Sequence, residues 1–147
     1  MDREVLHKEI DLIQACITRM ANNSFLLKGW AVSIVAVVLA LAEKAANPAL
    51  LSAILLIPLL SFWYLDAFFL RTEKMYRKMY EWVLEKRKKD DNAFLYDLNP
   101  NRFEKEVNSI FGIMFSVTLR CFYGIPVLLT LIVVIIRIIQ LVINKGA

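Results

Sequence analysis

Three long apolar runs, separated by polar segments, dominate the pattern of hydrophobic and polar positions along the chain. They cover residues 25–46, 49–70 and 110–143, and charged residues are nearly absent from each of them. Runs of about 20 apolar residues are long enough to cross the hydrocarbon core of a bilayer as helices. Glycine and proline are sparse and there is no repeated alternation of period two, which argues against a β-barrel. The chain is therefore predicted to be an all-α membrane protein, with residues 1–147 forming a single helical membrane domain.

Residues 48–89 are predicted to form one long helix, or two helices stacked on one axis. Its first half is apolar as far as Leu65, it crosses Asp66, and its second half is rich in good helix formers. A helix of this length measures about 60 Å, about twice the thickness of the hydrocarbon core. The part at 49–70 is therefore predicted to be the second span, kinked at Pro58, and the remainder is predicted to extend into water.

Residues 1–22 are predicted to form an amphipathic helix in the cytoplasm. Their apolar side chains recur at alternating steps of four and three, which is the spacing of a heptad seam. Such a seam packs either on another helix of the same chain or on a second subunit, and the sequence leaves both alternatives open. The seam consists of Leu6, Ile10, Ile13, Ile17 and Met20.

The first span is predicted at residues 25–46, after a break at 21–24 in which Asn23 or Ser24 caps the new helix. Only about 22 Å of helix separates Lys28 from Glu43, which is short for a span. Small residues recur along one face of this span, and such a face lets helices approach closely in lipid. We expect it to contact either a second subunit or the chain's own second span. The face consists of Gly29, Ser33, Ala36 and Ala40.

The segment 71–109 is predicted to be cytoplasmic. It carries more than half of the 18 Lys and Arg residues, and positively charged loops stay on the cytoplasmic side of a membrane. The tight turn predicted at 43–48 then lies outside, and the N-terminus is cytoplasmic. Aromatic residues support this orientation, because four of them fall at the ends assigned to the inner face, as an interfacial belt would. They are Trp30, Trp63, Tyr64 and Tyr123.

The start of this segment and the N-terminal helix are predicted to form a cytoplasmic helical layer. Two apolar stripes should bury against helix 1–22, namely Met75, Met79 and Trp82, and Tyr76, Tyr80 and Val83. Basic side chains beside them are candidates for contact with a partner or with anionic lipid headgroups. These are Arg71, Lys74, Arg77 and Lys78.

The last apolar block is divided by Arg120. Residues 110–120 are too short to cross and are predicted to lie at the inner interface, whereas 121–143 form the third span, with a kink marked by Gly124 and Pro126. If 110–120 also crossed the membrane, the chain would have four spans. The predicted fold therefore has three or four transmembrane helices and a cytoplasmic helical layer.

Asp66 is the side chain that stands out in the spans. An ionisable group within a span is costly, so it marks a candidate functional site. One alternative is a structural ion pair between Asp66 and Arg120, which should lie at a similar depth. The other is a ring of Asp66 side chains at the mouth or gate of a pore between subunits.

The sequence offers little for catalysis. His7 is the only histidine, and there is no phosphate-binding glycine loop, zinc-ligand spacing or pair of carboxylates in an apolar pocket. We therefore expect no enzyme activity, no catalytic or metal-binding residue, no cofactor and no nucleic-acid partner. Cys16 and Cys121 imply no disulfide framework and are expected to be reduced thiols.

Three segments carry a resemblance to a known group of proteins. They are RMANNSFLLKGW at 19–30, FWYLDAFFLRTEKMYRKMY at 62–80 and FYG at 122–124. These segments resemble small bacterial membrane proteins encoded near TIR-type antiphage signalling components, and the group is similar in style to SLATT membrane effectors. The resemblance implies a multi-pass protein of the bacterial inner membrane that assembles and breaches the membrane once a partner senses infection. The third apolar block is a departure from two-span SLATT proteins.

Three functions are therefore expected as alternatives. The first is an oligomeric inner-membrane effector of antiphage defence that permeabilises or depolarises the membrane when triggered. Its partners would be membrane lipids, copies of itself, and a soluble signalling protein or a nucleotide-derived signal. The second is a non-conducting scaffold that recruits a soluble partner through its basic cytoplasmic helices. The third is a phage holin-like protein, against which the long basic cytoplasmic helix argues.

Overall fold

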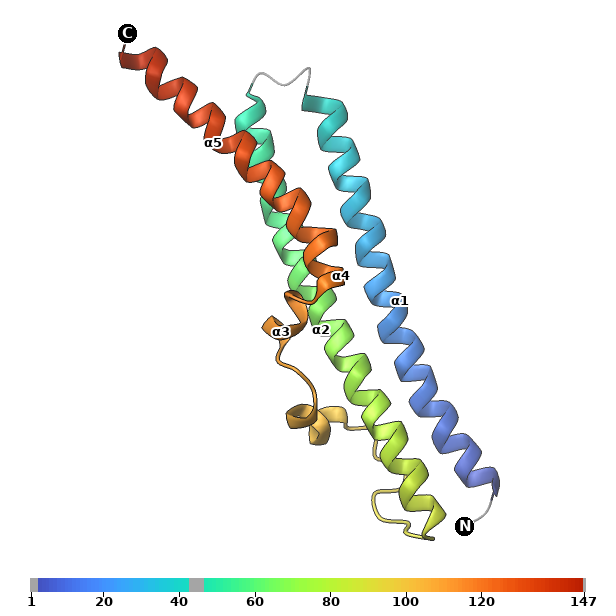
Figure 1. Ribbon diagram of the computed structural model, residues 1–147. Coiled ribbons are helices and arrows are strands. Elements are labelled where there is room, and N and C mark those ends of the chain that lie inside the picture. Colours follow the sequence, from blue (N-terminus) through green and yellow to red (C-terminus); the bar gives the residue numbers. More distant parts are fainter. Residues whose placement is uncertain (1–2, 43–46, 147) are drawn as a thin grey trace.

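The computed structural model describes residues 3–42 and 47–146, and in these ranges the chain consists of helices and loops. Two long helices, α1 (Arg3–Ala42) and α2 (Pro48–Lys88), run antiparallel and side by side along nearly their whole lengths (Figure 1). The third long helix, α5 (Ile125–Gly146), packs on α2 and leans away from the pair towards its C-terminus. The shorter elements between α2 and α5 are η1 (Pro100–Glu106), α3 (Ile110–Met114), α4 (Val117–Leu119) and η2 (Arg120–Gly124).

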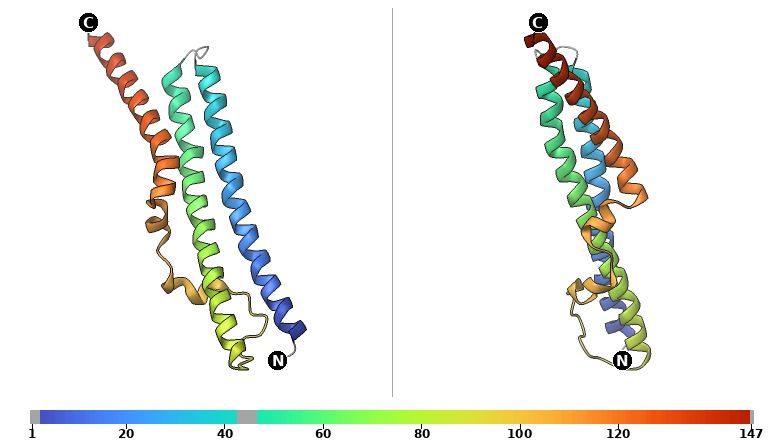
Figure 2. Two further views of the ribbon diagram at one scale, coloured as in Figure 1. Left: turned by 45° about the vertical axis from the view of Figure 1, so that its right-hand side comes forward. Right: turned by 60° about the vertical axis from the view of Figure 1, so that its left-hand side comes forward.

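Helix α1 is continuous, and the predicted break at 21–24 is wrong. The amphipathic helix predicted at 1–22 and the span predicted at 25–46 are parts of one 40-residue helix, as far as both are described. Asn and Ser are weak helix formers, but neither blocks a helix as proline does. Packing along α2 on both sides of this run therefore overrides the local preference (Figure 2).

Helix α2 agrees with the prediction for residues 48–89. The Asn47 side chain caps its first turn by accepting a hydrogen bond from the backbone N–H of Leu50 at 3.1 Å, and Pro48 occupies the first turn. The helix continues through Pro58 and ends at Lys88. The turn predicted at 43–48 falls mostly outside the described residues.

Within residues 3–42 and 47–146, three helices are long and apolar enough to span a membrane, at Arg3–Leu41, Leu50–Lys88 and Val117–Gln140. The third apolar segment differs from its prediction. Its helix is interrupted at Phe115–Ser116, between α3 and α4, and Arg120 lies inside the segment that is long enough to span rather than at its boundary.

A turn of π-helix, η2, occupies residues 120–124 just before Pro126. Proline has no N–H to offer the carbonyl four residues earlier, and a π-helical turn is one way in which a helix adapts to such a gap. The irregularity predicted from Gly124 and Pro126 therefore takes the form of a π-helical turn.

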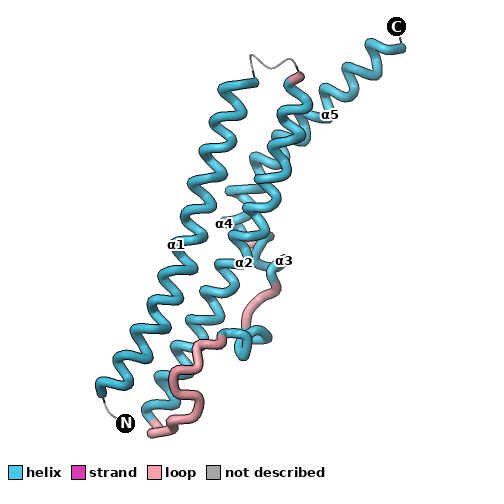
Figure 3. Tube along the Cα trace, turned by 180° about the vertical axis from the view of Figure 1, so that it is seen from behind, coloured by secondary structure: helices cyan, strands magenta, loops and turns pink. Residues whose placement is uncertain are grey.

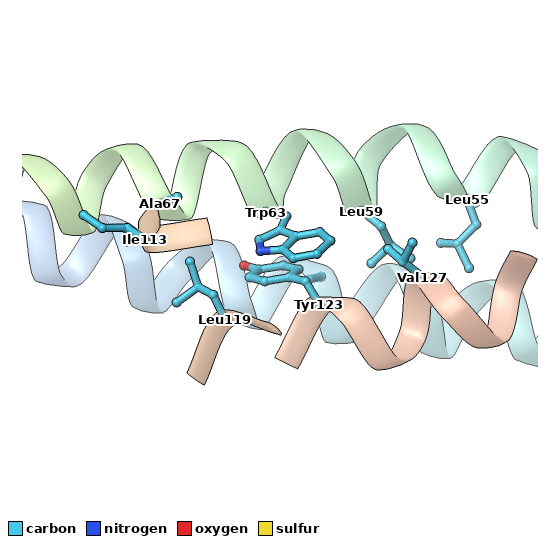
Figure 4. Packing of buried hydrophobic residues seen from close by; sticks show 9 residues of the cluster. Leu55, Leu59, Trp63, Ala67, Ile113, Leu119, Tyr123 and Val127 are labelled. Atoms are coloured by element: carbon cyan, nitrogen blue, oxygen red, sulfur yellow. The ribbon is translucent and has the colours of Figure 1, made fainter. Parts of the chain in front are cut away.

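Two apolar clusters hold the helices together. The first joins α1, α2 and the segment from α3 to α5 around Leu59, Trp63 and Tyr123 (Figure 4). The second joins the N-terminal half of α1 to the C-terminal half of α2 around Ile13 and Met79, and Phe103 of η1 covers it. The loop after α2 turns back beside α2 and leads to η1, which packs on α2 (Figure 3).

Candidate functional site

Asp66 lies at the centre of a buried polar cluster between α1 and α2. Its side chain is 0% exposed. Ser24 Oγ donates a hydrogen bond to Asp66 Oδ1 at 2.5 Å, and Lys28 Nζ lies 2.5 Å from Asp66 Oδ2. Lys28 Nζ also donates to Ser24 Oγ at 2.8 Å. The three side chains therefore form a closed triangle that joins the two helices.

The continuity of α1 creates this triangle. Ser24 and Lys28 are one helical turn apart, so they share a face of α1, and that face lies against Asp66 of α2. A helix break at 21–24 would have moved Ser24 away from its helical position. Instead of capping a new helix, Ser24 uses its hydroxyl across the helix interface.

Tyr123 closes the cluster from the η2 side. Its ring is fully buried and stacks on Trp63, with centroids 6.4 Å apart and an angle of 14° between the planes (Figure 4). The Trp63 Nε1–H donates to the backbone carbonyl of Met114 at 2.8 Å. The Tyr123 hydroxyl faces the Asp66 carboxylate, although its geometry falls short of a regular hydrogen bond.

This arrangement corrects the two expectations for Asp66. The expected pair with Arg120 does not form in the described part of the chain. Lys28 takes that place, while Arg120 is exposed and packs its side-chain methylenes beside Gly124. The expected ring of Asp66 side chains at a pore mouth requires exposed carboxylates, and in this conformation Asp66 has no exposed surface.

A second buried ion pair fixes the other end of the helix pair. Arg87 donates from Nε to Glu9 Oε2 at 2.9 Å and from Nη2 to Glu9 Oε1 at 2.8 Å. Both side chains are at most 2% exposed. This two-point contact between a guanidinium and a carboxylate is the strongest geometry for such a pair.

The same pair organises the loop that follows α2. Arg87 Nη1 donates to the backbone carbonyls of Asp91 and Ala93, and Glu9 Oε1 accepts from the Tyr96 N–H at 3.1 Å. Asp90, Phe94 and Tyr96 all have positive φ, between 54° and 58°, which side-chain-bearing residues seldom adopt. The buried pair therefore holds a loop with an uncommon backbone course.

The predicted seam on the N-terminal helix is used within the chain. Ile13 is 1% exposed, and Ile17 and Met20 pack against the same cluster of α2 residues, which includes the predicted stripe residues Met75 and Met79. Leu6 and Ile10 are half-buried. The alternative in which this seam joins two subunits is therefore not available in this conformation.

The small-residue face of the first span is not packed on the second span. Gly29, Ser33, Ala36 and Ala40 are all exposed, and a Cβ built at Gly29 would meet nothing within 4 Å. Ala31, which is 2% exposed, makes the close approach to the first apolar cluster instead. Of the two alternatives for this face, the contact with the chain's own second span is wrong.

Most of the predicted basic side chains have acidic partners in the chain. Arg71 bonds to Glu104 at 3.1 Å and to the carbonyl of Asn108 at 3.2 Å, so it ties η1 to α2. Arg77 pairs with Glu73 at 2.7 Å and Lys78 with Glu81 at 2.9 Å, while Lys74 is exposed.

Two of the four residues predicted as an interfacial belt have another role. Trp63 and Tyr123 are core residues, 8% and 0% exposed, whereas Trp30 and Tyr64 are 62% and 45% exposed. The lone His7 is also exposed. In the described ranges no cluster of three or more His, Cys, Asp or Glu side chains is arranged to hold a metal ion.

The contacts of Ser24 and Lys28 with Asp66, and of Glu9 with Arg87, were not predicted from the sequence. The spacing of the apolar seam could have indicated them. Glu9 lies four residues before Ile13, and Ser24 lies four residues after Met20, so both fall on the face of α1 that contacts α2. A polar residue at a seam position requires a polar partner opposite it.

Comparison of the chain with protein-family models, with curated proteins and with solved structures finds no match.

Proposed function

We propose that this protein is a membrane effector whose copies assemble in the bacterial inner membrane and permeabilise or depolarise it when triggered. The observation that carries the proposal is how little the three apolar helices cover one another. In the most apolar window of each helix, only 11%, 28% and 11% of the residues are buried. Most of their apolar surface is left for lipid or for further copies of the chain.

The open small-residue face of α1 favours copies of the chain at that position. Gly29 leaves open space, and Ser33 bonds its hydroxyl to the Gly29 carbonyl at 3.0 Å, so this face exposes little polarity. In lipid, helices associate through close packing of such small residues rather than through the hydrophobic effect. An assembly through α1 would leave the contacts of α2 within each subunit intact.

The need for a trigger follows from where the polar groups lie. Asp66, Ser24 and Tyr123 are turned inward within one subunit, and this conformation brings none of them to the exposed face of a span. A conducting state therefore requires either a wall built by several subunits or the opening of the Lys28–Asp66 contact. The role in antiphage defence, with a soluble protein or a nucleotide-derived signal as the trigger, rests on the resemblance of 19–30, 62–80 and 122–124.

Induced expression in a bacterium, with a potential-sensitive dye as the readout, tests the proposal. Wild-type chain should collapse the membrane potential, either on expression or on addition of its trigger system. Ser33→Phe should abolish this effect because it places a ring on the small-residue face. Ile57→Phe adds a ring on α2 at a side chain that is 68% exposed, and should leave the effect unchanged.

An unchanged potential at high levels of wild-type protein in the membrane, with the trigger system present, would contradict the proposal. Equal behaviour of the two phenylalanine variants would refute the role of the small-residue face.

One observation favours a second function, a non-conducting scaffold. The loop after α2 exposes Phe94, Leu95 and Tyr96 by 58%, 37% and 40%, and Arg87 holds the loop in place. The loop lies about 27 Å along α2 beyond Leu70, which is farther than the headgroup layer extends. A soluble protein could therefore dock there. In that case Phe94→Ser should remove the partner from isolated membranes. The membrane potential should stay constant on expression of either the wild-type protein or the variant.

A further inference from the structure

An apolar groove lies between α1 and α5 and has a volume of about 370 Å³. It exists because both helices pack mainly on α2 rather than on each other. Val32 and Leu39 form the α1 wall, Phe122 and Pro126 form the opposite wall, and Leu59 lies on the α2 side. The groove therefore lies in the apolar part of the protein and opens towards the lipid that would surround it.

The groove ends at the buried charge cluster. Lys28, Val32, Val35 and Leu39 follow one another at steps of four, three and four, so they lie along one line on α1. Tyr123 belongs to both places, because its ring lines the groove and its hydroxyl faces Asp66.

The Lys28 ammonium keeps hydrogen-bonding capacity. Its side chain is 24% exposed, and its Nζ lies 2.5 Å from Asp66 Oδ2 and donates to Ser24 Oγ at 2.8 Å. Its contact with the Ser24 carbonyl is long, at 3.5 Å. An ammonium carries three N–H groups, so one can turn to an outside acceptor while Nζ stays beside Asp66.

The dimensions of the groove match one leaflet of a bilayer. From Ala31 to Leu39 the α1 wall measures about 12 Å, and half of the hydrocarbon core measures about 15 Å. Lys28 lies about one turn beyond the groove, where the headgroup of a lipid seated in it would begin.

We propose that this groove binds one anionic phospholipid of the surrounding bilayer, with an acyl chain along the groove and the phosphate at Lys28. A phosphate can accept a charge-assisted hydrogen bond from the Lys28 ammonium, whereas the apolar side chains of a neighbouring helix cannot. This binding does not depend on whether the protein permeabilises the membrane. It provides a lipid contact at the point where α1, α2 and η2 meet.

Native mass spectrometry tests the proposal on full-length protein reconstituted in equimolar phosphatidylglycerol and phosphatidylcholine and then released from the membrane. Wild-type chain should retain one phosphatidylglycerol in preference to phosphatidylcholine. Ala36→Trp fills the groove and should lower the retained lipid about fivefold or more. Ala40→Trp is the matched control, because Ala40 is an exposed alanine one turn along the same helix and does not line the groove.

The double variant Lys28→Gln with Asp66→Asn tests the headgroup contact. It removes the cation and leaves no unpaired carboxylate, so the fold should survive, with circular dichroism as the check. Phosphatidylglycerol and phosphatidylcholine should then be retained equally.

Three results would overturn the proposal. They are equal retention of the two lipids by wild-type chain, equal losses in Ala36→Trp and Ala40→Trp, and separation of a dimer by Ala36→Trp with lipid retention unchanged. The last result would mean that Ala36 contacts a second copy and that no lipid occupies the groove. If the double variant fails to fold, the two tryptophan variants still decide the outcome.

Discussion

The ion pair between Glu9 and Arg87 allows the sharpest test of how the helices are held together. Glu9→Gln keeps the shape of the side chain and removes its charge, which leaves the Arg87 guanidinium, 1% exposed, without a counterion. Removing one partner of a buried pair costs about 3–5 kcal/mol. That is a large part of the 5–15 kcal/mol that stabilises a typical domain.

The loss should come from the unpaired charge rather than from the missing hydrogen bonds. Adding Arg87→Gln to Glu9→Gln removes the unpaired charge, so the double variant should be no less stable than Glu9→Gln alone. Some loss will remain, because Arg87 also bonds to the carbonyls of Asp91 and Ala93. A double-mutant cycle separates the coupling of the pair from these loop contacts.

Two measurements report this result. Denaturant titration followed by circular dichroism gives the free energy of unfolding in detergent. Hydrogen exchange at the Tyr96 amide, which donates to Glu9, reports the local opening of the loop. Glu85→Gln is the control, because Glu85 pairs with Lys89 at the surface, and its stability should match wild type. A Glu9→Gln chain as stable as this control would refute the reasoning.

Three further predictions concern the cluster, Cys16 and the loop. Asp66→Leu should lower stability more than Asp66→Asn, because leucine offers Lys28 no acceptor; equal unfolding curves would contradict this. Cys16, which is buried in the second apolar cluster, should resist a maleimide in the folded protein and react only on unfolding, as peptide mass mapping would show. A hydrogen bond from Lys86 lowers the pKa of the Asp91 carboxyl in the folded protein. The stabilisation from this contact is therefore complete above the unfolded pKa of about 3.9 and is lost as the pH falls through the lower folded pKa. Hydrogen exchange of the loop amides, measured against pH, should show the loop loosening in that range.

The coarse fold could be predicted from the sequence because long runs without charge permit few alternatives. A run without charge and of sufficient length must be a helix in a bilayer. The segregation of charge therefore located three apolar helices, and the long helical pattern predicted from Pro48 to Lys89 matches α2 to within one residue. The stripes at Met75 and Met79 predicted where α2 packs on α1.

The polar pairs could not be predicted in the same way. Residues 21–24 resemble a helix break because Asn and Ser cap helices well, and only the packing on both sides of them keeps α1 continuous. Once a break was assumed at that position, Ser24 and Lys28 were no longer placed against Asp66. Glu9 and Arg87 are 78 residues apart, and nothing local to either residue indicates the other.

The uninterrupted course of α1 also has a mechanical consequence. The helix is held to α2 at two buried polar contacts, Ser24 and Lys28 against Asp66 and Glu9 against Arg87. These contacts lie about 22 Å apart along α1, and about 21 Å of helix continues from Lys28 to Ala42. Because both contacts resist tilting of α1 against α2, a load on the N-terminal end is passed along the helix axis to Ala42 rather than lost in bending.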